Sequence, residues 1–540
     1  MSEGFRKFFS KNYLSLILIA VFLLLAYLLY YNSFNAPWEG DEGEYAYSAW
    51  LIERGEVPYY YSFLQKPPMI IYAYLVAHII RPFAIWPPRL LAFIFTLTSC
   101  LLLAVTARRL YGTRAGWAAL YVAAPLLSYW RLGALAANTE KFMLVPLTGL
   151  LALFAFRHRT ETPWTYLAAG SLAALAILYK PIALPPVALL IIYWLGINWY
   201  ESRDVRGLAR STGLVMTAGL GTAFLVFSYF IFNGAFFEMW QQIYVFNVSY
   251  AKSTLNYFPR FFFQYWLIIL FAFWPLALVA LASFYFRFKL IGLWWALFLV
   301  SLLFIMTTRI GHYYLLLMPF WVLIVAGVVS GFREKIADKA WVDVYLIGLI
   351  AFIWVIFGAV ISGQFWLDPA SLNKFIYGHN NNFSEAMLMA EKVKEITGPD
   401  ERIFVAGAEP QIYYFSRRVS VSRLNVTWPL YLDTPWRDRY QALVLQDLRT
   451  GRPPVIVLPL GNSALWAGTS TSAAFIDFLE KELEDNYHFV GGTISKFEHG
   501  KYLGPQWVDP GRVTTSSLLL FVRRPEGDHA EDPYIFRRYR

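Results

Sequence analysis

Four carboxylates stand within six residues, directly after the first long apolar segment of the chain: Glu39, Asp41, Glu42 and Glu44. Only 15% of all residues are charged, and carboxylates this close repel one another. A solvated loop at a helix end would account for them, and the N-terminal end of a helix would favour Asp41 and Glu42. The alternative is chemical: a carboxylate held at a membrane surface could act as a general base or bind a cation.

A lysine and an acid stand alone in two other turns between apolar segments. Lys66 precedes Pro67-Pro68 at the head of a short apolar run, where a cation suits an anion, although it could also extend to lipid headgroups. Glu140 enters an apolar helix within one turn and needs compensation, for which Arg131 and Lys141 are candidates. Isolated charges at membrane helix ends are also where function concentrates.

A third turn carries the segment Arg309-Ile310-Gly311-His312-Tyr313. Arginine and histidine at the start of a helix suit a phosphate group, and histidine also suits a metal ion. A single histidine is usually structural, so this segment gains meaning only together with the other charges.

The elements that must position these residues are membrane helices. The chain is 58% hydrophobic and 19% aromatic, with a mean hydropathy of +0.45, which is typical of polytopic membrane proteins. Apolar runs long enough to cross a bilayer predict eleven spans, near 14–31, 90–107, 115–130, 141–156, 164–179, 182–199, 212–232, 261–286, 290–308, 313–332 and 341–363. The apolar run 69–80 is too short and is predicted to lie in the membrane interface.

Basic residues fix the predicted orientation. With the N-terminus in the cytoplasm and 69–80 not spanning, five basic loops fall on the cytoplasmic side, at 108–114, 157–159, 201–210, 287–289 and 333–339. The net charge of +10 therefore reflects membrane topology, and a nucleic-acid partner is not expected. All the turns discussed above become exoplasmic. The single cysteine, Cys100, leaves no intramolecular disulfide.

Two domains follow from this pattern: a transmembrane domain over 1–363 and a soluble exoplasmic domain over 364–540. The first exoplasmic loop is predicted to hold two surface helices along the membrane, at 42–54 and 68–80. In the tail, strands near 402–407, 454–458 and 516–522 and a helix over 473–486 indicate a small α/β domain.

Five segments, taken in order and on one side of the membrane, resemble the lipid-linked-sugar glycosyltransferases of the GT-C fold. The resemblance is to the bacterial and archaeal protein-mannosyltransferase-like family, which includes the aminoarabinose transferases acting on lipid A. It covers about 1–330 and rests on Asp41-Glu42-x-Glu44-Tyr45-Ala46, Lys66-Pro67-Pro68, Arg131 to Glu140, Leu178-Tyr179-Lys180-Pro181 and Arg309-x-x-His312-Tyr313.

The resemblance implies an inverting transfer of a sugar from a polyprenyl-phosphate donor to an exoplasmic protein, lipid or glycan. It implies that Asp41 is the general base and that Glu140 assists across the site. It also implies that the lipid phosphate is held by Lys66, Arg309, His312 and Tyr313.

A metal ion is left open. Some relatives carry an acid directly before the lysine, where it helps to bind a divalent metal, but this chain has Gln65 there. Glu42, Glu44 and His312 could still supply ligands.

The sequence leaves two alternative functions open. A transporter or flippase for a lipid-linked or small anionic substrate would also need many spans and isolated charges, but it predicts internal repeats and charges near the bilayer midplane. A membrane anchor that presents 364–540 as a binding module is the third reading.

Overall fold

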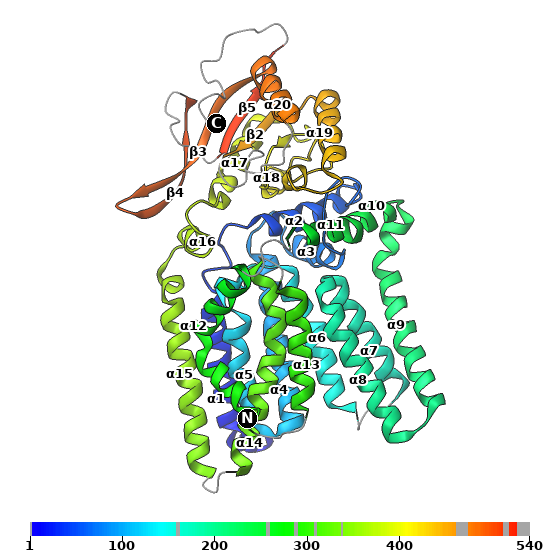
Figure 1. Ribbon diagram of the computed structural model, residues 1–540. Coiled ribbons are helices and arrows are strands. Elements are labelled where there is room, and N and C mark those ends of the chain that lie inside the picture. Colours follow the sequence, from blue (N-terminus) through cyan, green and yellow to red (C-terminus); the bar gives the residue numbers. More distant parts are fainter. Residues whose placement is uncertain are drawn as a thin grey trace.

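A bundle of long helices forms the larger part of the computed structural model, which describes residues 3–157, 162–254, 260–285, 290–306, 310–335, 339–460, 473–510 and 518–525. Within the described residues its helices are α1 (Glu3–Tyr30), α4 (Trp86–Tyr111), α5 (Thr113–Leu127), α6 (Thr139–Ala155), α7 (Pro163–Tyr179), α8 (Leu184–Ser202), α9 (Val205–Phe232), α12 (Arg260–Ala282), α13 (Ile291–Ile305), α14 (Met318–Lys335) and α15 (Lys339–Trp366). They run roughly side by side (Figure 1).

Each predicted span coincides with one of these helices. Six described segments are long and apolar enough to cross a membrane, namely Tyr13–Tyr30, Trp86–Tyr111, Pro181–Ser202, Val205–Phe232, Phe263–Ala282 and Gly311–Phe332. Pro163–Tyr179, Ile291–Ile305 and Ile347–Ala359 are shorter apolar helices. The membrane character of the chain is clear, while the crossing by all eleven helices stays a prediction.

Two short helices lie across one end of the bundle, α2 (Gly40–Glu53) and α3 (Met69–Ile80) (Figure 1). Glu39 and Glu42 begin α2 with a capping box, in which each residue's side chain meets the other's backbone. The expectation of a surface helix is wrong for α2, because its residues 42–51 are buried. The small helix α18 (Gln411–Ser416) packs against it so closely that a Cβ on Gly43 would lie 2.6 Å from the Gln411 backbone nitrogen.

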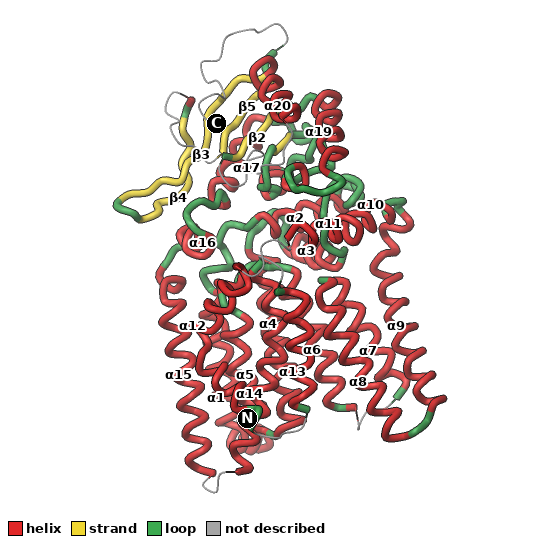
Figure 2. The backbone as a smooth tube through the Cα atoms, in the orientation of Figure 1, coloured by secondary structure: helices red, strands yellow, loops and turns green. Residues whose placement is uncertain are grey.

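The described part of the tail forms a mixed sheet with the order β1-β2-β5-β3-β4 (Figure 2). Its strands are β1 (Phe404–Val405), β2 (Val455–Pro459), β3 (Tyr487–Glu498), β4 (Lys501–Val508) and β5 (Leu518–Arg523). β1 and β2 are parallel, and the other pairs are antiparallel. Its helices are α16 (Pro369–Tyr377), α17 (Phe383–Ile396), α18, α19 (Arg437–Gly451) and α20 (Ala473–Asn486).

The α/β character of the tail is as predicted, and β1, β2, β5 and α20 match predicted elements. The β3–β4 hairpin was not predicted, because Gly491-Gly492 and Gly504-Pro505 interrupt its pattern. Gly491 has a φ of +146°, and a Cβ there would lie 2.6 Å from the Trp507 ring. The glycine therefore lets Trp507 pack directly on the strand.

The tail is docked on the first loop by buried hydrogen bonds. The Phe63 backbone nitrogen donates to Asn425 Oδ1 at 2.7 Å, Tyr47 Oη accepts from the Ser420 nitrogen at 3.0 Å, and Asn373 Nδ2 donates to the Pro37 carbonyl at 2.7 Å. Two further helices, α10 (Phe236–Trp240) and α11 (Phe246–Thr254), lie beside this junction (Figure 1). The junction encloses the candidate site.

Candidate active site

A cavity of about 510 Å³ lies where the first loop, the start of the segment Gly311–Leu317 and the C-terminal domain meet. Asp41, Lys66 and His312 line it from the bundle side, and Glu409 and Trp428 line it from the domain side. The structure thus brings together residues that are hundreds of positions apart in the sequence.

Asp41 lies in the first turn of α2 with 29% of its side chain exposed. Its Oδ2 accepts a hydrogen bond from Tyr45 Oη at 3.2 Å and lies 4.0 Å from Lys66 Nζ. Burial acts to raise the pKa of Asp41, but the charges of Lys66, His312 and Lys180 outweigh it and hold the pKa below its usual value. Asp41 is therefore an ionised carboxylate in an accessible position.

Lys66 is nearly buried, with 6% of its side chain exposed. Pro67 and Pro68 stiffen the chain behind it, and its carbonyl accepts a hydrogen bond from Tyr59 Oη at 2.6 Å. Burial lowers the pKa of Lys66, but Asp41 and other neighbours raise it above the ordinary value overall. A fixed, charged ammonium group therefore faces the cavity.

Glu140 is fully buried, and its partner is neither Arg131 nor Lys141. Its Oε1 lies 2.9 Å from Lys180 Nζ and 3.8 Å from His312 Nε2, and its Oε2 accepts from Thr139 Oγ1 at 2.9 Å. Lys180 Nζ also lies 4.2 Å from the centre of the Tyr313 ring. The other two basic residues lie elsewhere: Lys141 donates to Tyr30 Oη and the Leu127 carbonyl, and Arg131 stacks on Trp130.

Lys180 is the charged residue of this site that reasoning from single motifs left without a role. It stands between α7 and α8 in Tyr179-Lys180-Pro181, where the proline ends one helix and the lysine starts the turn. The sequence does mark Lys180 as a candidate, because it is an isolated lysine in a turn on the same side of the predicted membrane as the other charges.

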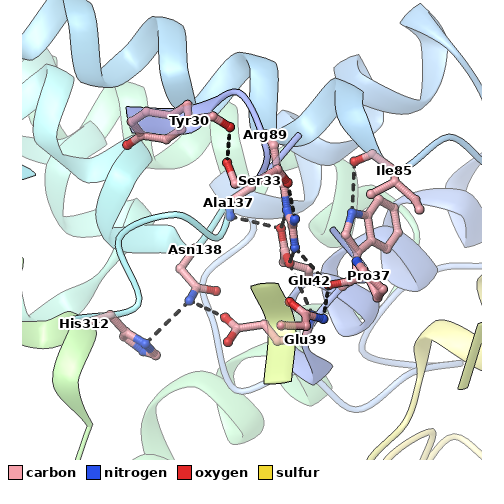
Figure 3. A network of polar contacts seen from close by, with 12 residues as sticks. Tyr30, Ser33, Pro37, Glu39, Glu42, Ile85, Arg89, Ala137, Asn138 and His312 are labelled. Carbon is pink, nitrogen blue, oxygen red and sulfur yellow. Dashed lines mark hydrogen bonds and ion pairs between the residues drawn. The ribbon is translucent and has the colours of Figure 1, made fainter. Parts of the chain in front are cut away.

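Glu42 has a structural role, because its carboxylate is bound by other parts of the protein (Figure 3). Arg89 forms a bidentate ion pair with it, in which Nε lies 2.9 Å from Oε1 and Nη2 lies 2.6 Å from Oε2. The backbone nitrogens of Ala137 and Glu39 donate to the same carboxylate, at 3.0 and 3.3 Å. Four hydrogen bonds occupy the lone pairs of Glu42, so it does not suit a metal ion.

Glu39 connects this structural network to the cavity (Figure 3). Asn138 Nδ2 donates to Glu39 Oε1 and lies 3.5 Å from His312 Nδ1. Burial first, and then the charges of Asp41 and Glu42, raise the pKa of Glu39 to about 8. A protonated Glu39 adds no charge beside Asp41.

Glu44 lies one turn further along α2 and is also buried. Its Oε1 accepts a hydrogen bond from Trp428 Nε1 at 3.3 Å. Burial and the charge of Asp41 raise the pKa of Glu44 to about 8. Of the four clustered carboxylates, Asp41 is thus the one that combines ionisation, access to the cavity and a cationic neighbour.

Within the described ranges, no group of three or more His, Cys, Asp and Glu side chains is arranged to hold a metal ion. Together with the saturated Glu42, this gives the site no metal-binding set among those residues. Arg309 lies outside the described residues.

Residues 65–231 match the family model "Dolichyl-phosphate-mannose-protein mannosyltransferase". The comparison with curated proteins gives no match. Among solved structures, ArnT from Cupriavidus metallidurans bound to undecaprenyl phosphate aligns with a TM-score of 0.57 at 15% identity, over 94% of this chain and 98% of that chain. An Archaeoglobus fulgidus oligosaccharyltransferase aligns less well, with a TM-score of 0.47 at 12% identity over 93% of this chain and 74% of that one.

The family match and the fold agree with the resemblance seen in the motifs. The chain is a polytopic membrane protein with the GT-C glycosyltransferase fold, and its residues 65–231 match the dolichyl-phosphate-mannose-protein mannosyltransferase family.

Proposed function

We propose that this chain is an inverting membrane glycosyltransferase that moves a sugar from a polyprenyl-phosphate donor to an exoplasmic protein, lipid or glycan. The observation that carries the proposal is the convergence of an ionised Asp41 with Lys66 and His312 at one cavity, with the charge of Lys180 acting on Asp41 as well. The ArnT structure with a similar fold holds undecaprenyl phosphate, which supports a lipid phosphate as the donor group.

The chemistry needs a base and fixed cations. Asp41 takes the proton of the acceptor hydroxyl or amine while that atom forms a bond to the anomeric carbon. The bond from the anomeric carbon to the phosphate oxygen breaks, and its electron pair leaves with the polyprenyl phosphate. Lys66 and His312 stabilise the charge that develops on the phosphate, because both line the cavity with side chains that are only 6% and 16% exposed.

Glu140 holds Lys180 and His312 in place in this proposal. Its contacts go to Lys180, His312 and Thr139, and it is fully buried. We therefore assign it a positioning role, with Lys180 and Tyr313 as the supports of the phosphate end of the site. We also propose Arg309 for the phosphate end of the site, because it lies three residues before His312 in the sequence.

The location of the site fits an exoplasmic reaction. The N-terminus and the α8–α9 connection lie at the end of the bundle away from α2 and α3 (Figure 1). If the basic loops are cytoplasmic, the cavity and the C-terminal domain are exoplasmic. Nucleotide sugars stay in the cytoplasm, so a lipid-linked donor suits a reaction on this side.

Asp41→Asn tests the proposal. The variant keeps the hydrogen-bonding shape of the side chain but loses the base, so sugar transfer should fall at least about 1,000-fold while polyprenyl-phosphate binding persists. Product is measured by mass spectrometry after incubation with polyprenyl-phosphate sugars and membranes. Near-normal turnover in this variant would remove Asp41 from the mechanism.

Asp204→Asn is a matched control, because Asp204 lies in the α8–α9 connection at the far end of the bundle. It should transfer sugar at the wild-type rate. If wild-type protein forms no product but moves lipid across vesicles, the transporter reading replaces the enzyme.

A further inference from the structure

The cavity has two unlike walls. The C-terminal domain contributes one of them, here called the domain wall and represented by Tyr377, Asn381, Asn382, Glu409, Trp428 and Tyr431. We propose that the domain wall is a carbohydrate subsite that binds an uncharged sugar ring. The proposal rests on the proposed function and adds the place and chemistry of sugar recognition.

The charges are divided between the walls. Of the described residues that line the cavity, Lys66 is the only lysine or arginine, and it stands with His312 on the bundle side. The domain wall instead offers amides, one carboxylate and aromatic rings. A phosphate is therefore favoured at the bundle side, whereas an anionic group on the domain wall would meet the carboxylate of Glu409.

The loop that carries the asparagine side chains of the domain wall is held in place by the buried side chain of Lys374. Lys374 Nζ donates to the carbonyls of Asn381 and His379, at 2.5 and 3.4 Å, and pairs with Glu385 at 3.0 Å. Lys374 and Glu385 are both buried. Ser495 and Tyr502 donate to Glu385 Oε1 at 2.6 and 2.9 Å. The loop that carries the asparagines is thus fixed before any ligand arrives, which reduces the entropy lost on binding.

Glu409 lies deep in the domain wall, with 3% of its surface exposed. Asn382 Nδ2 lies 3.5 Å from its Oε1. A carboxylate beside an amide presents acceptors and donors at adjacent positions, which suits the neighbouring hydroxyl groups of a sugar.

Trp428 supplies an aromatic surface at the edge of the cavity. Its ring packs on Phe63 and Phe246, with centroids 5.5 and 5.6 Å apart, and its Nε1 bonds Glu44. These contacts fix the ring while it still lines the cavity. A rigid aromatic face covers the apolar face of a sugar ring at low entropic cost.

Binding assays on the full-length chain in detergent test this subsite with three probes: polyprenyl phosphate, polyprenyl-phosphate mannose and free mannotriose. Trp428→Ala and Glu409→Gln should each weaken a sugar-bearing probe about tenfold and leave polyprenyl phosphate unaffected. Weaker binding of polyprenyl-phosphate mannose assigns the subsite to the donor sugar, and weaker binding of mannotriose assigns it to the acceptor.

Matched controls use the same substitutions away from the cavity. Trp366 is 85% exposed on α15 and Glu498 is exposed at the end of β3, so Trp366→Ala and Glu498→Gln should bind all three probes as the wild type does. If Trp428→Ala does not fold, Trp428→Phe keeps an aromatic face without the bond to Glu44 and should retain sugar binding.

Two results would overturn the subsite: wild-type protein that neither binds mannotriose nor binds polyprenyl-phosphate mannose better than polyprenyl phosphate, or variants that lose polyprenyl phosphate as strongly as the sugar probes. Failure of the proposed function looks different. In that case polyprenyl phosphate does not bind at all, while mannotriose binding still depends on Glu409.

Discussion

At the scale of single residues, the protonation states of the clustered carboxylates set the charge that surrounds the donor phosphate. Asp41 is ionised because its pKa is lowered, whereas the pKa values of Glu39 and Glu44 are raised to about 8. Near neutral pH both glutamates are therefore mostly protonated. As the pH rises through about 8 they lose their protons and add negative charge near Lys66.

This predicts a pH effect on donor binding. A polyprenyl-phosphate sugar is a phosphodiester with constant charge between pH 6 and 9, so a change in its affinity must come from the protein. We expect the KM for the donor to rise about fivefold between pH 7 and 9, because the new carboxylates compete for the cations. The double variant Glu39→Gln/Glu44→Gln should have a flat KM over this range, and a persistent rise would assign the effect to other groups.

Lys180 gives a second prediction at the same scale. Lys180→Met leaves the fully buried Glu140 without its closest cation and should destabilise the folded protein by about 3–5 kcal/mol. The double variant Lys180→Met/Glu140→Gln removes the orphaned charge and should recover most of the stability, but not kcat/KM, because the cation remains absent. Thermal unfolding in detergent and donor kinetics measure the two effects. Recovery of kcat/KM in the double variant would reduce the pair to a structural role.

Some of these residues were predictable and others were not. Asp41, Lys66, Glu140 and His312 stood out because each is a polar residue at the end of an apolar run, and the structure gathers them. The roles of Glu42 and Lys180 depend on partners from other helices, Arg89 and Glu140. Local sequence carries no information on such pairs.

At the scale of elements, α2 is the part that connects the bundle to the C-terminal domain. Its sequence predicts a helix with Asp41 and Glu42 in the first turn, and the structure has that helix. Its full burial was not predictable, because α18, which covers α2 together with α3, lies more than 350 residues later in the chain. Gly43 lies at this contact, because the Gln411 backbone occupies the space that a side chain at position 43 would need.

Gly43→Ala tests this contact. The added methyl group would lie 2.6 Å from the Gln411 nitrogen, so α2 and α18 must separate, at a cost of about 1–3 kcal/mol. Gly221→Ala in α9 is the matched control, because nothing lies within 4 Å of its Cβ position and alanine favours a helix. We expect opposite shifts of the unfolding temperature in the two variants. A stabilising effect of Gly43→Ala would contradict the close packing.

At the scale of the whole molecule, the apolar runs predicted the helices of the bundle, and hydrophobic periodicity predicted an α/β tail. The way these two parts assemble could not be predicted, because it depends on buried polar contacts between distant segments. The Phe63 nitrogen and Asn425 Oδ1 are one such pair, 362 residues apart. Since the cavity lies between the parts, docking and site formation are one event.

The bundle and the C-terminal domain should therefore unfold together. Cys100, the single cysteine, is fully buried in α4, so its reaction with a thiol dye reports unfolding of the bundle. Hydrogen exchange in Val455–Pro459 reports unfolding of the domain. We expect one shared midpoint on heating.

Asn425→Ala should break this cooperation. It leaves the buried Phe63 nitrogen without its acceptor, which costs about 1–3 kcal/mol at the junction. We expect the hydrogen exchange of Val455–Pro459 to begin at a lower temperature than the reaction of Cys100, and the donor KM to rise as the cavity loosens. Asn233→Ala is the control, because Asn233 is exposed and donates to Tyr229 in its own helix. Equal midpoints in Asn425→Ala, with an unchanged KM, would show that the site does not depend on this docking.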